Sequence, residues 1–359
     1  MQLDYITFGR FSGSATALQE ALQRLVNVRH HDLTAIARHP RMLRHRLAAR
    51  AEAGREPNEI PWSKTEAWSK GLQQEARRRA WIRESAPALF VQTMGAFLPP
   101  IEASPYYIYT DRLAHERLDV DDAFTRGASR AWLMRERAFV KGASRVFLMG
   151  QRSVASALRD YGLNRDRFVV VGAGPNAPPA APRQATHCRT VLFVGTTWEA
   201  KGGPELLSAF EAVSGDHQSL RLVLVGVEPP GELPRNVEVA GHVPHSSVTG
   251  FYANADLLVI PSRSEAYGIA LTEALLSGVP CIATALGNQP SIVGEAGVCV
   301  RPGDASQLEQ ALREVVSNYP KYKGAAMARG ERMRTVWSWG VVARLMVESM
   351  KRDCGLMPG

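Results

Sequence analysis

Short runs of apolar residues alternate with segments of helical periodicity along most of the chain. In the first half, the runs that predict buried strands are residues 4–8, 88–92, 106–111, 145–149 and 168–171. Between several of them, apolar residues recur at helical spacing, as in 18–26, 131–142 and 154–161. Residues 35–86 are charged and contain tryptophan, and their composition favours helix. This alternation predicts a parallel sheet covered by helices.

The same alternation resumes in the second half, after a break rich in proline. Residues 177–182 read Ala-Pro-Pro-Ala-Ala-Pro, and proline at this density removes N–H donors and indicates an extended linker. Strand runs then follow at 191–195, 222–226, 237–241, 257–260 and 281–284. We therefore expect an α/β fold of two doubly wound Rossmann-like domains, at 1–178 and 186–335, with an amphipathic helix in 336–359.

The stretch from 257 to 280 carries the clearest candidate chemistry. An apolar run stops at Pro261, small and polar residues follow, and helical spacing then lasts until Gly278. Gly268 lets a ligand approach the backbone, and the start of the helix presents unpaired N–H groups that suit a phosphate. Glu265 and Glu273 lie on either side of that start. An anion site with two acceptor groups suggests a sugar nucleotide.

Three further positions suit an anionic ligand. Lys201, beside paired glycines, suits a diphosphate. Arg263 is a candidate second cation near the glutamate loop, with an arginine that merely faces solvent as the simpler alternative. Gly13 belongs to a loop of small residues that either admits a substrate or forms a plain tight turn.

Pro261-Ser262, followed by Glu265, seven intervening residues that include Tyr267-Gly268-Ile269, and Glu273, resembles the E-x7-E signature of retaining glycosyltransferases of family 4. The resemblance implies the GT-B fold, in which two Rossmann-like domains face a central cleft. It also implies that 1–178 binds the acceptor, that 186–335 binds the nucleotide sugar, and that the helix in 336–359 returns to the first domain.

The resemblance further implies roles for individual residues. Glu265 would contact the sugar and Glu273 the ribose, while Lys201, Gly268 and Ile269 would bind the diphosphate. Residues near the nucleotide base or phosphates would be Gly195, Thr196, His242 and Val243. The family usually has arginine at the position of Thr196, so either nucleotide affinity is lower or another cation compensates.

On the acceptor side, the first domain offers Asp111 and His115 as candidate catalytic residues. Family members often have a histidine in this vicinity, whereas this chain has Thr110-Asp111, with His115 four residues later. Asp111 could equally cap the next helix, and His115 could lie on the surface. No cluster of metal-ligand residues is visible in the sequence, and we expect no metal.

Composition narrows the class of partner. A length of 359 residues suits two domains, and the formal charge of +8 favours an anionic partner. The basic stretch 38–47 is interpreted as a solvated helix face, with docking to an anionic membrane as the alternative and nucleic acid not expected. Four widely spaced cysteines indicate neither a metal cluster nor a disulfide framework.

The start of the chain shows no basic leader before an apolar run, and no stretch approaches the length of a transmembrane span. We therefore expect a cytoplasmic protein, peripheral to the inner face of the membrane if the basic stretch docks there. The expected function is retaining transfer from a nucleotide diphosphate sugar, a UDP-sugar being favoured over a GDP-sugar, to a glycan, lipid-linked or small-molecule acceptor. The alternatives are a non-catalytic nucleotide-sugar-binding protein and another GT-B enzyme such as an epimerase or a phosphorylase.

Overall fold

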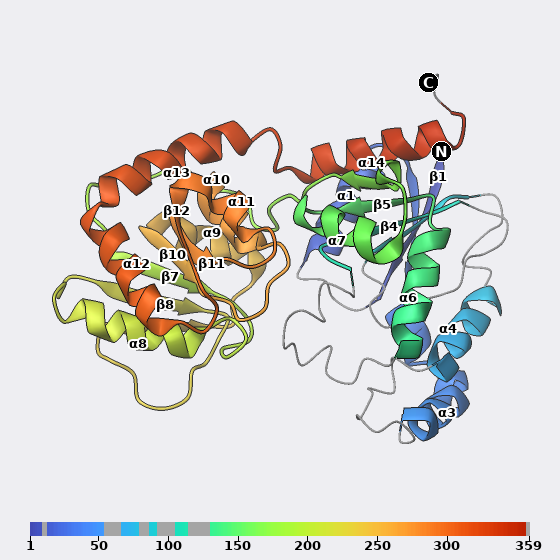
Figure 1. Ribbon diagram of the computed structural model, residues 1–359, viewed down its shortest axis with the longest axis horizontal. Helices are drawn as coiled ribbons and strands as arrows, with labels where there is room; N and C mark the ends of the chain where they lie inside the picture. The colour runs from blue at the N-terminus through green and yellow to red at the C-terminus, as the bar shows by residue number, and fades with distance from the viewer. Residues whose placement is uncertain (9–12, 54–65, 79–85, 92–104, 114–129, 357–359) are drawn as a thin grey trace. The chain divides into compact units, whose positions relative to one another are not determined.

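The computed structural model describes residues 1–8, 13–53, 66–78, 86–91, 105–113 and 130–356 (Figure 1). The chain forms two compact units, one of Met1–Gly172 with Trp339–Gly359 and one of Ala173–Ser338. Each unit is built on its own six-stranded sheet, and every strand pair in both sheets is parallel. The predicted pair of doubly wound α/β sheets is confirmed.

The sheet of the first unit has the strand order β2-β1-β3-β4-β5-β6. Its strands are β1 (Gln2–Thr7), β2 (Asn27–Asp32), β3 (Ala88–Val91), β4 (Tyr106–Thr110), β5 (Arg145–Leu148) and β6 (Phe168–Val170). The described helices are α1 (Ser14–Gln23), α2 (Leu33–Ala37), α3 (Leu43–Ala53), α4 (Glu66–Arg78), α6 (Arg130–Gly142), α7 (Arg152–Tyr161) and α14 (Trp339–Asp353). One core joins the sheet to α2, α4, α6 and α7.

The edge strand β2 is an element that the sequence pattern did not predict. Its residues, Asn-Val-Arg-His-His-Asp, are polar and are half-buried or exposed. The strand forms because its side chains neutralise Asp4, which is fully buried in β1. Arg29 makes two hydrogen bonds of 2.8 Å to the Asp4 carboxylate, and His31 Nε2 lies 3.0 Å from Asp4 Oδ1. This tertiary pairing outweighs the low strand propensity of the segment.

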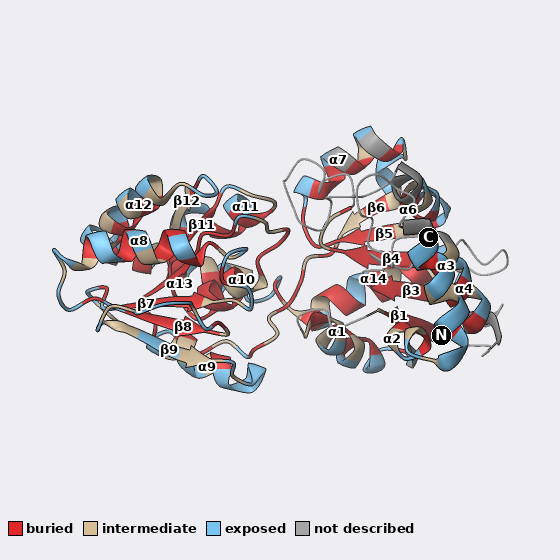
Figure 2. Cartoon of the chain, turned by 90° about the horizontal axis from the view of Figure 1, so that it is seen from below, coloured by how far each residue is buried: buried red, intermediate tan, exposed pale blue. Residues whose placement is uncertain are grey.

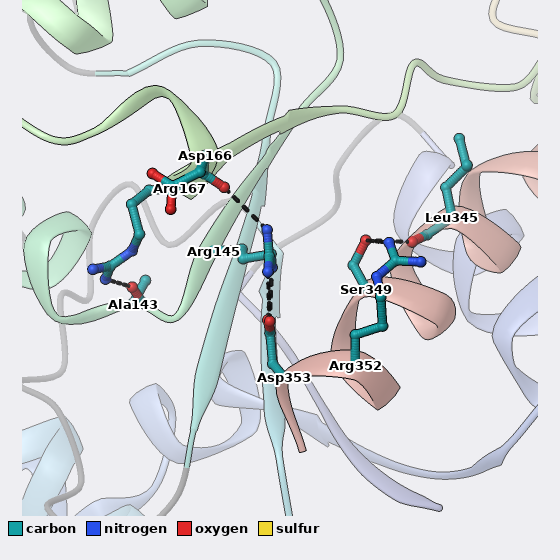
Figure 3. Close-up of polar contacts among 8 residues, drawn as sticks. All are labelled: Ala143, Arg145, Asp166, Arg167, Leu345, Ser349, Arg352 and Asp353. Atoms are coloured by element: carbon teal, nitrogen blue, oxygen red, sulfur yellow. Dashed lines mark hydrogen bonds and ion pairs between the residues drawn. The ribbon is translucent and has the colours of Figure 1, made fainter. Parts of the chain in front are cut away.

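The helix α14, which begins at Trp339, is fastened to the first unit by an ion pair at its far end (Figure 3). Arg145, at the start of β5, donates to Asp353 Oδ2 at 2.7 Å and to Oδ1 at 2.6 Å. The same guanidinium donates to the carbonyl of Asp166 at 3.0 Å. α14 also packs against α1. The first and the last helix of this unit therefore lie side by side.

The sheet of the second unit has the strand order β12-β11-β10-β7-β8-β9. Its strands are β7 (Thr190–Val194), β8 (Arg221–Val225), β9 (Val237–Gly241), β10 (Leu257–Ile260), β11 (Cys281–Thr284) and β12 (Gly297–Val300). Its helices are α8 (Gly203–Ser214), α9 (His245–Asn254), α10 (Ile269–Leu276), α11 (Gln289–Val293), α12 (Ala305–Ser317) and α13 (Tyr319–Met333). The central strands are buried, as parallel strands covered on both faces require (Figure 2).

The proline-rich segment expected as a linker is held against helices of the second unit. Ala180 N donates to Ser277 Oγ at 3.0 Å, and Thr249 Oγ1 donates to the carbonyl of Pro178 at 2.8 Å. The division between the units falls at Gly172, ahead of this segment, whereas the sequence analysis places the end of the first domain at 178. Among the described helices, none combines the length and apolar character needed to cross a bilayer.

Candidate functional site

The order of the second sheet reverses between β7 and β10, and this reversal locates the candidate site. From β7 the chain proceeds through β8 to β9 on one side, and β10 then returns to the other side of β7. In open parallel sheets, ligands bind beyond the carboxyl ends of the strands at such a reversal. The loops that follow β7 and β10 contain Lys201 and Glu265. The topology thus brings the two predicted donor-site residues to the same edge of the sheet.

Lys201 and Glu265 form an ion pair at this point. Lys201 Nζ donates to Glu265 Oε2 at 2.5 Å, with the two side chains 25% and 18% exposed. Glu265 Oε1 accepts a hydrogen bond from the N–H of Ala266 at 3.1 Å. A cation and an acceptor group therefore face the same partly solvated space, which suits a ligand carrying both phosphate and hydroxyl groups.

The two loops are held together by a close backbone contact that only glycine permits. Gly202 has φ 74°, and a Cβ atom there would lie 2.0 Å from the carbonyl oxygen of Pro261. Arg263 N donates to the carbonyl of Ala200 at 3.0 Å beside this contact. The loop after β7 also approaches the loop after β8 closely. A Cβ on Gly226 would lie 2.2 Å from the Gly195 carbonyl oxygen. The Gly202 contact and the hydrogen bond from Arg263 hold the loop with Lys201 against the loop with Glu265.

Arg263, the candidate second cation, has a carboxylate partner of its own. Its Nε and NH2 lie 2.7 Å and 2.6 Å from Glu205 Oε1, and its side chain is 52% exposed. Glu205 stands in the first turn of α8 and is buried. The ion pair holds the partly exposed Arg263 against the first turn of α8.

The start of α10 brings backbone donors and two unpaired polar side chains together. Gly268, with φ 97°, caps the helix that begins at Ile269. Gln289, which is fully buried, packs near Gly268 and uses its Oε1 to accept from the N–H and hydroxyl of Thr284. Within the described part of the chain, Gln289 Nε2 and the buried Ser262 Oγ have no hydrogen-bond partner.

Such unpaired buried groups are costly unless a ligand uses them. Gln289 and Ser262 were not predicted as site residues from the sequence. The available signal was their position in the segments that follow β11 and β10, at the carboxyl edge where ligands collect.

Glu273 is buried and already accepts three hydrogen bonds from the protein. Its Oε1 accepts from the N–H groups of Asn176 and Ala177 at 2.8 and 2.9 Å, and its Oε2 accepts from the Tyr252 hydroxyl at 2.8 Å. Burial raises the pKa of the Glu273 carboxyl above its ordinary value, although these three donors each oppose the rise. The residue therefore ties the segment after Gly172 to α10, and by its lone pairs Oε2 can accept one further hydrogen bond.

Asn288 and Ser291, in the segment after β11, hydrogen-bond to the backbone beside the site. Asn288 is buried, and its Nδ2 and backbone N–H both donate to the carbonyl of Ala266 at 3.1 Å. Gly287 packs so closely that a Cβ would lie 2.4 Å from that same carbonyl oxygen. Ser291 Oγ donates to the carbonyl of Asn288 at 2.7 Å. Together these residues support the backbone that carries Glu265.

The remaining candidates of the second unit lie along the same carboxyl edge. Thr196 is exposed in the loop after β7. His242 is exposed and Val243 is half-buried in the loop after β9, where Gly226 N donates to the Gly241 carbonyl at 2.7 Å. β9 is separated from β7 by β8, so these two residues lie farther from Lys201 than Glu265 does.

In the first unit, Asp111 follows β4 and hydrogen-bonds to its own loop. Asp111 Oδ1 accepts from the N–H of Arg112 at 2.8 Å, and the Asp111 carbonyl accepts from Ser153 Oγ at 3.2 Å. Gly13, with φ 80°, caps α1. His115 lies outside the described residues. No group of three metal-ligating side chains gathers within the described ranges.

Part of the second unit matches a known protein family. Residues 188–318 match the family model described as "Glycosyl transferases group 1". The chain is 27% identical over 231 residues to the D-inositol 3-phosphate glycosyltransferase of Corynebacterium diphtheriae, covering 56% of this chain and 54% of that protein. The chain thus spans about half the length of this curated relative.

Solved structures resemble the chain over almost its whole length. A sucrose-phosphate synthase from Thermosynechococcus elongatus has a TM-score of 0.74 and 16% identity, covering 99% of this chain and all of that one. Anabaena HepE in complex with UDP has a TM-score of 0.68 and 14% identity, covering 98% of this chain and 100% of that one. At these identities the likeness shows the fold, and the expected GT-B fold is confirmed.

Proposed function

We propose that this protein is a retaining glycosyltransferase that transfers a sugar from a nucleoside diphosphate sugar to an acceptor. The observation that carries the proposal is the meeting of Lys201 and Glu265 at the β7/β10 reversal. A cation beside a hydroxyl acceptor suits a diphosphate joined to a sugar, and the match of this unit to glycosyl transferases group 1 agrees with that chemistry.

In this proposal the diphosphate lies between Lys201 and the start of α10 at Gly268 and Ile269. The helix dipole and the lysine both stabilise the negative charge that develops on the leaving diphosphate. Gln289 Nε2 and Ser262 Oγ are donors near the same helix start, and they would bind phosphate or sugar oxygens. Glu265 accepts hydroxyl groups of the transferred sugar.

The nucleoside is proposed to extend along the carboxyl edge of the second sheet, from β7 toward β9. The one acceptor position left on Glu273 Oε2 suits a ribose hydroxyl, and the loop with His242 and Val243 would border the base. UDP is the favoured nucleotide, with GDP as the alternative. The structural likeness to a protein solved with UDP supports this choice.

Asp111 and His115 are proposed to contact the acceptor, which would be a glycan, a lipid-linked sugar or a small molecule. The Asp111 Oδ1 bond to the N–H of Arg112 holds the carboxylate in place and leaves Oδ2 to accept a hydroxyl proton or hydrogen bond. Retention follows if the departing diphosphate helps to deprotonate the acceptor on the same face, with Lys201 and α10 stabilising it. This scheme uses no metal, so transfer should survive excess EDTA.

Contact with an anionic membrane is proposed for α3. Leu43 and Leu47 are each 58% exposed and stand one helical turn apart, beside the exposed Arg44 and Arg50. Sedimentation with vesicles that contain phosphatidylglycerol tests this surface. Binding should fall for Leu43→Ser/Leu47→Ser and should be absent with phosphatidylcholine vesicles.

The test of the proposed function is a thermal-shift screen with UDP-, GDP-, ADP- and dTDP-glucose. A ligand at a hundred times its dissociation constant adds about 2.7 kcal/mol of stability, which the melting temperature will report. Stabilisation by one nucleotide sugar, lost in Lys201→Gln, is the expected result. Slow hydrolysis of that donor separates a transferase from a protein that only binds it.

A further inference from the structure

A cavity lies at the amino edge of the second sheet, the edge opposite the one that carries Lys201 and Glu265. It has a volume of about 460 Å³ and is lined by residues that include Arg183, Arg189 and Arg221. Arg221 is the first residue of β8, and Arg189 directly precedes β7. The loops with Lys201 and Glu265 follow the other ends of these strands, roughly 16 Å away for five residues of strand. The cavity is therefore separate from the proposed donor site.

Among the described residues that line this cavity, Asp256 is the one with a carboxylate. Its carboxylate points inward and is hydrogen-bonded within the protein. It is buried directly before β10. Its Oδ2 accepts from the N–H groups of Arg189 and Thr190, both at 2.9 Å, and its Oδ1 pairs with the Arg183 guanidinium. Three guanidinium groups thus line the cavity with one carboxylate, which leaves a net positive site for an anion.

Arg189 and Arg221 are the groups available to such an anion. They are neighbours, since Arg221 N donates to the Arg189 carbonyl at 2.8 Å. Arg221 Nε donates to Thr190 Oγ1 at 2.9 Å, which orients the guanidinium and leaves its two terminal nitrogens as donors. Within the described ranges, neither side chain is paired with a carboxylate. Guanidinium groups in this arrangement suit bidentate binding of a phosphate.

A less polar cavity of about 380 Å³ adjoins the first one and is lined by residues of α9. The two cavities share Thr190, Arg221 and Asn254, and the second adds Phe251 and Glu238. An aromatic ring with a carboxylate and an amide suits a sugar, whose apolar face packs on the ring while its hydroxyl groups donate to the carboxylate. Glu238 would repel a second anion, so the charged end of a ligand belongs beside the arginines.

We propose that these two adjoining cavities together bind a phosphorylated monosaccharide, with its phosphate on Arg189 and Arg221 and its sugar over Phe251. The volume of each cavity lies within the range of small-molecule sites. The inference does not depend on the proposed transferase activity, because it concerns the other edge of the sheet.

Calorimetric titration of the full chain with glucose 6-phosphate tests the proposal, with saturating UDP present to occupy any phosphate site near Lys201. Saturable binding is expected, and Arg221→Gln and Arg189→Gln should each weaken it by about tenfold or more, the scale of a lost charge-assisted contact. Arg235→Gln, at an exposed arginine outside both cavities, is the matched control and should leave the affinity unchanged. Inorganic phosphate should bind more weakly than glucose 6-phosphate.

Absence of saturable binding to the wild-type chain would overturn the proposal. Equal affinities in Arg221→Gln and Arg235→Gln would do so as well. Loss of binding in Lys201→Gln, with Arg221→Gln unaffected, would assign the phosphate to the candidate donor site instead. Equal affinity for inorganic phosphate and glucose 6-phosphate would contradict the role given to Phe251.

Discussion

Lys201 Nζ lies 2.5 Å from Glu265 Oε2, so the cation of one loop and the acceptor of the next are already paired. In the proposed function, a diphosphate that binds Lys201 shares its ammonium group with Glu265 and so weakens the ion pair. Glu265 would then accept hydroxyl groups of the attached sugar more readily. In this scheme the ion pair couples the binding of the diphosphate to the availability of Glu265.

This coupling predicts that substitutions of Lys201 and Glu265 affect UDP affinity differently. Lys201→Gln should weaken UDP binding by about tenfold or more, because a charge-assisted contact of roughly 1.5–3 kcal/mol is lost. Glu265→Gln should keep or raise UDP affinity, because the competitor for Lys201 is weakened, while transfer falls. Calorimetry with UDP measures both, with Lys321→Gln on α13 as the control. Equal losses in the two variants would contradict the coupling.

The three hydrogen bonds to Glu273 predict that its main measurable effect is on stability. Glu273→Ala should lower the free energy of unfolding by about 1–3 kcal/mol, because the N–H groups of Asn176 and Ala177 lose their acceptor. Glu273→Gln keeps an oxygen for these donors and should cost much less. Denaturant unfolding of both variants measures the difference, and similar stabilities would show that the acceptor is dispensable.

The raised pKa of Glu273 predicts a pH dependence with a definite sign. The folded state binds this proton more tightly than the unfolded state, whose carboxyl has the ordinary value of 4.5. The proton bound to Glu273 therefore contributes fully to the free energy of unfolding below pH 4.5. This contribution is lost as the pH rises through the pKa of the folded state. Subtracting the unfolding free energy of Glu273→Gln from that of the wild type across pH 4 to 8 isolates this term. A difference that grows with pH would refute the sign.

Gly202 should tolerate no side chain, because of its contact with Pro261. Gly202→Ala combines the strain of positive φ, about 1–2 kcal/mol, with a clash against a carbonyl oxygen 2.0 Å from the added Cβ. Gly231→Ala is the control, since Gly231 has φ 85° and no atom within 4 Å of its Cβ position. Thermal unfolding should show the larger loss at Gly202. Equal losses would mean that the loops separate freely.

The sequence predicted most strands because buried parallel strands are continuous apolar runs, which are local features. It also predicted that Glu265, Gly268 and Glu273 frame a helix start, since their spacing along the chain is short. It missed β2, whose polar residues become stable only beside the buried Asp4. The pairing of Arg263 with Glu205 joins residues 58 positions apart, so a local sequence pattern cannot predict it.

The stereochemistry of donor hydrolysis tests the central claim most directly, because it needs no knowledge of the acceptor. The wild-type chain is mixed with the glucose donor that stabilises it most, and proton NMR reads the anomeric coupling of the released glucose before it equilibrates. The account predicts that α-glucose appears first from an α-linked donor, at a rate that Lys201→Gln and Glu265→Gln both reduce. Initial release of β-glucose, or hydrolysis that neither substitution affects, would contradict it.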